Sequence, residues 1–156
     1  MREHEYETEI DTRLEGKLGF DRVRTFVADR CSTEYAVTRV TEERFSNDPK
    51  VIRERLALTD EMRLIVMFEE NFPTNGYIDC LDFLKPLEKT GYTIDILSLG
   101  KLRTMVETVR KLTNFFMSIK DGVYPNLKRM SAPVLSFPEV QRRIDQILDK
   151  FGDVKD

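Results

Sequence analysis

The chain has 156 residues, of which 40% are hydrophobic and 34% are charged, and its formal net charge is −3. This composition excludes a disordered tail, and a domain of this length buries about 68–70% of its unfolded surface, so its core needs neither disulfides nor a metal ion. No segment approaches the ~20 apolar residues of a membrane helix, and the start lacks the apolar run of a signal peptide, so we expect a cytoplasmic protein.

Apolar residues recur at helical spacing along most of the chain, which predicts an all-α fold. The first clear helix is expected over about residues 18–30, with apolar side chains on one side and charged ones on the other. Ser32 is expected to cap a second helix, which should end near residues 45–47, where turn-forming residue types occur.

A long helix is predicted to begin at Asp48 and Pro49. The Asp side chain can accept hydrogen bonds from free backbone N–H groups, and a proline in the first helical position loses none. The helix should stop before Pro73. Residues 64–68 are apolar on all sides, which predicts that this end of the helix is buried against two neighbours.

The stretch that follows is the least regular part of the chain. Because a residue before proline avoids the α region, we expect Lys85 in an extended link, with residues 86–89 as one helical turn closed by Gly91. A second long helix is expected from residue 97 or 98 to Lys120, since apolar residues there recur at spacings of three and four.

Two shorter helices should complete an irregular bundle of long helices with short connecting helices. Residues 124–130 form one, started by its proline, and Ser136 and Glu139 have the spacing of a capping box for the other. The apolar stripe of this last helix comprises Val140, Ile144, Ile147, Leu148 and Phe151. We expect a flexible segment over residues 1–9 and a single helical domain over residues 10–156.

The glycines that precede Lys101 do not form a phosphate-binding loop. A P-loop follows the pattern G-x-x-x-x-G-K-[ST], in which the last hydroxyl reaches a magnesium ion. Here Gly91 and Gly100 are nine residues apart, and Leu102 occupies the hydroxyl position. We therefore interpret these glycines as a turn and a helix position.

Catalytic and metal-binding residue types are sparse. The single histidine, His4, lies in a polar N-terminal stretch, and the two cysteines, Cys31 and Cys80, lack the close spacing of a zinc site and are expected to be buried filling residues. The pairs Glu69/Glu70 and Asp79/Asp82 are interpreted as solvated or capping residues. We expect no catalytic, cofactor-binding or metal-binding residue in this chain, and no enzyme activity of its own.

Charge places any contact with nucleic acid in the second half of the chain. Residues 1–78 hold 12 basic and 17 acidic side chains, whereas residues 79–156 hold 13 basic and 11 acidic ones. The candidate contacts are Lys128, Arg129, Arg142 and Arg143, with Tyr124 nearby. A plain solvated helix face is the alternative, because acidic residues lie close to these cations in the sequence.

Three stretches of the sequence are similar to three sequence elements of a known family, and they follow one another in the same order. Residues 18–24 read LGFDRVR, residues 81–87 read LDFLKPL, and residues 137–156 include IDQILD followed by a glycine. These stretches resemble the opening, the Asp-Ile/Val-x-Pro-x-Leu element and the Ile-Asp-x-x-Ile-x-Asp element of bacterial MutS proteins of the second type, which lack the mismatch-reading domain. Gly19 departs from the glutamate of that family. The resemblance covers about residues 10–156.

The resemblance implies that these residues are the first part of the core, or lever, helices of a longer chain. That chain would continue into a clamp and an ATPase domain that dimerises the protein, often followed by a nuclease domain. This sequence holds no Walker lysine or signature serine, so ATP and magnesium are expected only in the full-length protein. The implied role is mechanical, linking ATPase state to a clamp around branched DNA or a stalled ribosome, in DNA repair, restraint of recombination or ribosome handling.

Two other hypotheses remain. The chain is a free-standing helical protein-interaction module with no DNA role, or it is an enzyme whose site lies in the irregular stretch 79–86. On the family interpretation, the partners would be the remainder of its own chain and a second protomer. Helices made to pack on that remainder would leave an apolar face open, so self-association is expected through residues 64–68 and 115–116.

Overall fold

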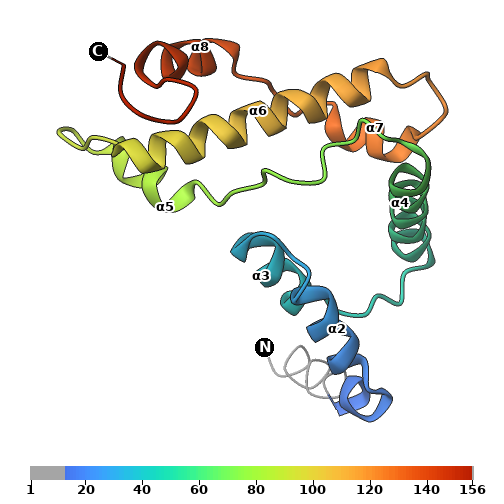
Figure 1. Cartoon of the computed structure of the whole chain (residues 1–156). Helices are drawn as coiled ribbons and strands as arrows, with labels where there is room; N and C mark the ends of the chain where they lie inside the picture. The colour runs from blue at the N-terminus through green and yellow to red at the C-terminus, as the bar shows by residue number, and fades with distance from the viewer. Residues whose placement is uncertain (1–12, 156) are drawn as a thin grey trace. The chain divides into compact units, whose positions relative to one another are not determined.

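The computed structural model describes residues 13–155 (Figure 1). The described part of the chain is all-helical, as predicted, apart from an isolated bridge between Leu148 and Val154. The flexible segment predicted over residues 1–9, with His4, lies outside the described residues.

Contacts divide the chain into two compact units, Met1–Pro49 and Lys50–Asp156. This division differs from the single helical domain expected over residues 10–156. Each unit has its own packing, so each is described by itself. Whether the two fold as one domain in solution stays a prediction.

The N-terminal unit contains a helical stretch over residues 13–18, then α2 (Phe20–Ala28) and α3 (Glu34–Glu42). Gly19 interrupts the helix expected over residues 18–30, because its φ of 71° is left-handed, a conformation that glycine adopts without strain. The predicted cap of α3 is one residue early. The N-cap is Thr33, not Ser32; its backbone is extended, and its side chain accepts the Ala36 N–H at 3.1 Å.

A buried ion pair joins the first two helical stretches of this unit. Arg24 donates two hydrogen bonds to the Glu15 carboxylate, at 2.6 and 2.7 Å, and the Glu15 residue is only 3% exposed. Arg24 also donates to the backbone oxygen of Glu43, just after α3, and lies 5.2 Å from the centre of the Phe20 ring. The Arg24 hydrogen bonds lower the pKa of Glu15 below its ordinary value.

The long helix α4 (Pro49–Phe68) begins at the proline, as predicted. The predicted burial of residues 64–68 against two neighbours is wrong. Ile65 is fully buried, whereas Val66, Met67 and Phe68 are 66%, 59% and 68% exposed. The reason is that the core takes from α4 only Ile65 and the partly buried Leu58, Met62 and Leu64. Figure 1 shows α7 beside the C-terminal end of α4.

The irregular stretch contains α5 (Leu81–Leu84) and a 3-10 helix, η1 (Lys85–Glu88). The extended link predicted at Lys85 is wrong, since its backbone is helical with φ −54° and ψ −44°. The Lys85 N–H donates to the Leu81 carbonyl, which continues α5 into η1. Pro86 falls in the first turn of η1, where a missing N–H costs nothing. The hydrogen bond of Lys85 therefore outweighs the restriction on a residue before proline.

The second long helix, α6 (Ile96–Ser118), begins one or two residues before the predicted start, because Asp95 caps it. The Asp95 carboxylate accepts the Ser98 N–H at 2.9 Å and the Ser98 hydroxyl at 2.7 Å. The helix ends at Ser118, two residues before the predicted Lys120.

Two shorter helices pack on α6: α7 (Pro125–Ser131) and α8 (Pro138–Ile147). The proline start predicted for α7 is confirmed. The capping box predicted between Ser136 and Glu139 is wrong, because the N-cap is Phe137, whose side chain has no group that could accept a backbone N–H. The Glu139 carboxylate instead accepts hydrogen bonds from arginines one turn later in α8.

The core of the second unit forms where α4 meets α6 and α7. Phe72, from the loop after α4, lies edge to face on Phe115, with 5.1 Å between the ring centres. The Tyr124 hydroxyl donates to the Glu69 carboxylate at 2.9 Å. The buried members of the core are Ile65, Phe115, Phe116, Tyr124 and Leu127.

Helix α8 is held on the first half of α6 by separate contacts. Arg103 forms an ion pair with Asp145, with 2.7 Å between Nε and Oδ1. Gln141 donates to the Glu107 carboxylate at 2.6 Å, and Ile144 of the same helix is buried. Hydrogen bonds from Arg110 and then Gln141 lower the pKa of Glu107 to about 2.

We predict that Ile65→Ala lowers the free energy of unfolding by about 2–5 kcal/mol, because it leaves a cavity at the fully buried centre of the core. The measurement is urea denaturation followed by circular dichroism. Val66→Ala, at the exposed neighbouring position, is the control and should change stability by about 0.5 kcal/mol or less. Equal losses in the two variants would contradict the assigned core.

We predict that the stabilisation from the Glu107 carboxylate depends on pH. Its folded pKa is depressed, so the contribution is complete above the ordinary value of 4.5 and is lost as pH falls toward about 2. The difference in urea midpoint between the wild type and Glu107→Gln should therefore be largest above pH ~5 and shrink toward pH ~2. A difference that does not change over this range would contradict the shifted pKa.

Candidate functional site

The four cations predicted to contact nucleic acid fall into two separate pairs. Lys128 and Arg129 lie on α7, beside the C-terminal end of α6, whereas Arg142 and Arg143 lie on α8, over the first half of α6 (Figure 1). The structure therefore does not bring them together as one basic patch.

The pair on α7 is engaged in contacts within its own unit. Lys128 donates to the Asp121 carboxylate at 2.7 Å and to the Ile119 backbone oxygen at 2.6 Å. The Arg129 guanidinium lies 3.5 Å from the Glu54 carboxylate of α4. These contacts hold α7 to its neighbours, and contact with nucleic acid stays a prediction for both residues.

The pair on α8 shares one carboxylate. Arg142 and Arg143 lie 2.6 and 3.2 Å from Glu139, and more than half of each arginine side chain is exposed. The shared carboxylate offsets part of their positive charge, as the solvated-face interpretation expects. Their contact with nucleic acid also stays a prediction.

The two cysteines are free thiols that differ in burial. Cys80 is buried, and burial raises the pKa of its thiol, which keeps the sulfur protonated. Cys31 is partly buried, so the expected filling role holds better for Cys80. Residues 13–155 contain no cluster of three or more side chains that could ligate a metal ion.

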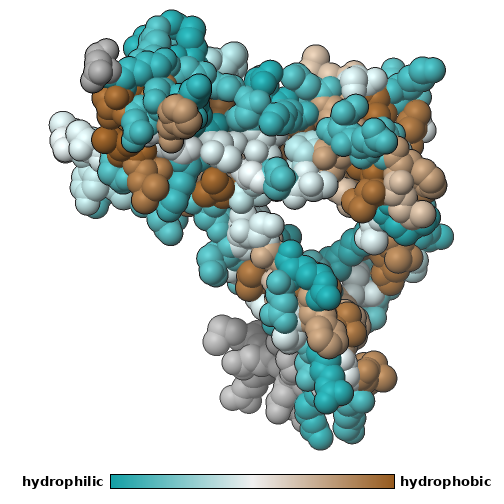
Figure 2. Space-filling view, in the orientation of Figure 1, coloured by the Kyte–Doolittle hydropathy of each residue, from teal (hydrophilic) through white to brown (hydrophobic). Residues whose placement is uncertain are grey.

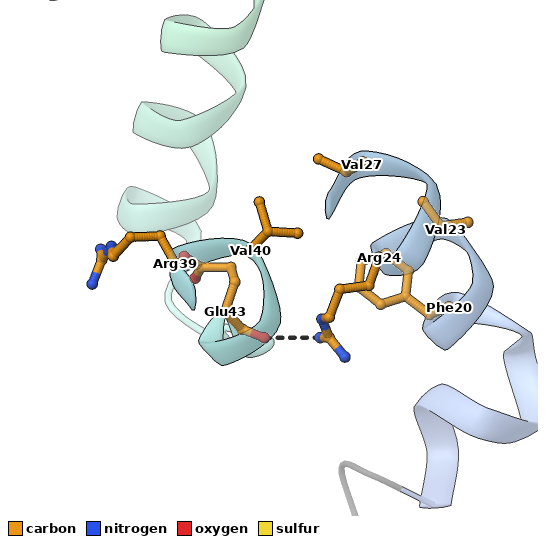
Figure 3. Close-up of a pocket in the computed structure, with 7 residues that line it drawn as sticks. All are labelled: Phe20, Val23, Arg24, Val27, Arg39, Val40 and Glu43. Atoms are coloured by element: carbon orange, nitrogen blue, oxygen red, sulfur yellow. Dashed lines mark hydrogen bonds between the residues drawn. The ribbon is translucent and has the colours of Figure 1, made fainter. Parts of the chain in front are cut away.

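The N-terminal unit contains an apolar pocket of about 330 Å³ between α2 and α3. Figure 3 shows Val40 of α3 facing Val23 and Val27 of α2, while the Arg39 side chain points away from α2. The full lining comprises Phe20, Val23, Arg24, Val27, Arg39, Val40 and Glu43.

Arg24 forms a fixed wall of this pocket, because its guanidinium is held by Glu15 and by the Glu43 backbone oxygen, the bond drawn in Figure 3. Val23 and Val27 remain about half exposed. The described lining residues include neither a nucleophile nor a histidine, so the pocket is suited to bind an apolar group rather than to react with it.

The spacing of apolar residues predicted the apolar side of the first helix but not the pocket. The spacing of Val23 and Val27 indicates which side of α2 is apolar. It contains no information on how completely α3 covers that side, because coverage depends on contacts distant in the sequence.

A second apolar surface lies at the end of α4, where Val66, Met67 and Phe68 face solvent. Figure 2 shows hydrophobic side chains at the surface in the region of α4 and α7. Phe115 and Phe116, expected in an open face of this kind, are buried in the core instead, which corrects that expectation. The three residues of α4 form what we call the α4 apolar end.

Comparison with known proteins gives no match: no family model, no curated protein and no solved structure matches the chain. Among the described helices, none is both long enough and apolar enough to cross a membrane.

We predict that the α2/α3 pocket binds a small aromatic compound such as indole at millimolar concentration. The methyl resonances of Val23, Val27 and Val40 should shift in nuclear magnetic resonance spectra on titration. Val27→Asp should abolish the shifts, because it places a charge at the pocket wall. Val66→Asp, at a similarly exposed position of α4, should leave them unchanged, and equal loss in both variants would contradict a specific pocket.

Proposed function

We propose that the chain is a non-catalytic core, or lever, segment of a MutS-type DNA-processing ATPase. The observation that carries the proposal is the collinear order of the three family-like sequence elements. The LGFDRVR stretch spans the break at Gly19 and the start of α2, LDFLKPL forms the continuous turn of α5 and η1, and the last element lies on α8 and the turn that follows. Each element thus lies at a helix start, at a connection between helices or at a helix end, which are the places where sequence signals set helix boundaries.

The apolar surfaces support the same proposal. The α4 apolar end exposes three large side chains, and the α2/α3 pocket leaves Val23 and Val27 half exposed. Exposed apolar patches are typical of surfaces that pack on another protein segment. A lever segment needs such surfaces, because the remainder of its own chain is its first partner.

On this proposal the helices transmit movement and carry out no chemistry. The ATPase, ATP, magnesium and the dimer contact belong to the remainder of the full-length protein, as does the clamp around branched DNA or a ribosome. DNA repair, restraint of recombination and ribosome handling are the processes in which such a protein would act, in the cytoplasm.

The alternative function is a free-standing helical protein-interaction module with no DNA role. The α2/α3 pocket favours it, because a pocket with an apolar lining and one fixed arginine wall suits a protruding apolar side chain of a partner. The two proposals differ in whether the coding sequence continues beyond these residues.

The proposal is tested by sequencing the native gene beyond the codon for Asp156 and by measuring ATP binding. We predict a frame that continues into G-x-x-x-x-G-K-[ST], and no ATP binding by the 156-residue chain in calorimetry, with binding restored in the longer protein. The longer protein with its P-loop lysine changed to alanine is the control. A stop codon directly after Asp156, or stoichiometric ATP binding by the short chain, would refute the lever proposal.

We also predict that the isolated chain self-associates through the α4 apolar end. Sedimentation velocity at rising protein concentration should show a dimer or larger species, and the double variant Met67→Asp/Phe68→Asp should weaken it. Leu135→Asp, at another exposed apolar position, is the matched control. A monomer at all concentrations would contradict the prediction.

A further inference from the structure

Glu61 is a buried carboxylate near the middle of α4, with 7% of its surface exposed. Its Oε1 accepts the Asn126 N–H at 3.1 Å and the Asn126 side-chain amide at 2.6 Å, and its Oε2 accepts the Leu127 N–H at 2.8 Å. Three donors thus compensate the desolvation of the charge, and all three come from the start of α7.

The start of α7 depends on these bonds. Pro125 has no N–H, and Tyr124, the N-cap, provides no side-chain cap within the described structure. The Lys128 N–H donates to the Tyr124 carbonyl, so the next free donors of the first turn are those that Glu61 accepts. A glutamate of one helix therefore replaces the missing cap of another.

Two further glutamates, Glu54 of α4 and Glu69 just after its last residue, also contact residues 124–129. Glu54 and Glu69 lie about two helical turns before and after Glu61. Glu54 pairs with Arg129 at 3.5 Å, and Glu69 accepts the Tyr124 hydroxyl at 2.9 Å. The partners follow in reverse order along the two segments, so three carboxylates from residues 54–69 meet the short stretch 124–129.

The contact that holds α8 uses none of these residues. Arg103 with Asp145 and Glu107 with Gln141 join α8 to the first half of α6. The contacts of α4 with α7 and with the C-terminal half of α6 are thus distinct from those that hold α8. Distinct groups of contacts can open at different free energies.

We propose that α4 is a detachable helix whose docking on α7 is controlled by Glu61, and that undocking of α4 also opens the first turn of α7. The α6–α8 contact stays closed during this movement. The coupling follows from the shared bonds, because once Glu61 leaves, the Asn126 and Leu127 N–H groups have lost their acceptor. This inference concerns the fold of residues 50–155 and does not depend on the proposed function.

The test is hydrogen exchange, measured by mass spectrometry, on the whole chain carrying Glu61→Gln. Glutamine keeps the shape but removes the charge, and it replaces one of the two accepting oxygens by an N–H₂ group, which cannot accept from the α7 donor that faces it. We expect exchange on the order of tenfold faster in α4 and residues 124–131, with no change in α8 or the first half of α6. Glu54→Gln, which alters the more exposed pair at 3.5 Å, is the control and should have little effect.

Two results would overturn the proposal: faster exchange spread evenly over α6 and α8, or unchanged exchange in residues 124–131. If Glu61→Gln does not fold, native-state exchange of the wild type in low urea replaces it. The amides of α4 and of the first turn of α7 should then open together, at lower urea than those of α6 and α8. Opening of all four helices at the same urea concentration would equally contradict a detachable α4.

Discussion

A carboxylate removed from water needs hydrogen-bond donors, and in the second unit this requirement determines how α4 packs on α7. Glu61 finds its donors at the start of α7, and α7 begins with a proline and lacks a cap of its own in the described structure. One contact thus gives the carboxylate its hydrogen-bond donors and gives the free N–H groups at the start of α7 an acceptor. The position of Ile65 in the core follows, since it lies one turn further along α4 and is directed to the same side.

The N-terminal unit uses the same principle with a different donor. Glu15 is almost completely buried, and the planar guanidinium of Arg24 satisfies both of its oxygens. The same guanidinium reaches the chain just after α3, so one ion pair connects three segments and forms one wall of the apolar pocket. A pocket with a rigid polar wall and an apolar floor can select an occupant by shape, because its wall does not move to follow the ligand.

The sequence predicted those features that depend on neighbouring residues and missed those that depend on distant ones. The starts of α4 and α7 were predictable because a proline fixes each locally. The exposure of residues 66–68 was not, because it depends on how much of α4 its neighbours cover. Glu15 and Glu61 were also missed, since a charged residue in an amphipathic pattern is normally assigned to the solvent side. The candidate cations were located correctly on helices, but their separation along α6 required the fold.

The distribution of apolar surface connects the structure to the proposed role. A segment that transmits movement needs one contact that can break and others that persist, because a uniformly packed bundle moves as one body. In the second unit, two polar pairs join α8 to α6 and Ile144 of α8 is buried, whereas α4 exposes apolar side chains at its end. Any partner that covers the α4 apolar end acts on the same helix that carries Glu61. Such a partner could therefore shift the docking of α4 only by as much as its affinities for the docked and undocked forms differ.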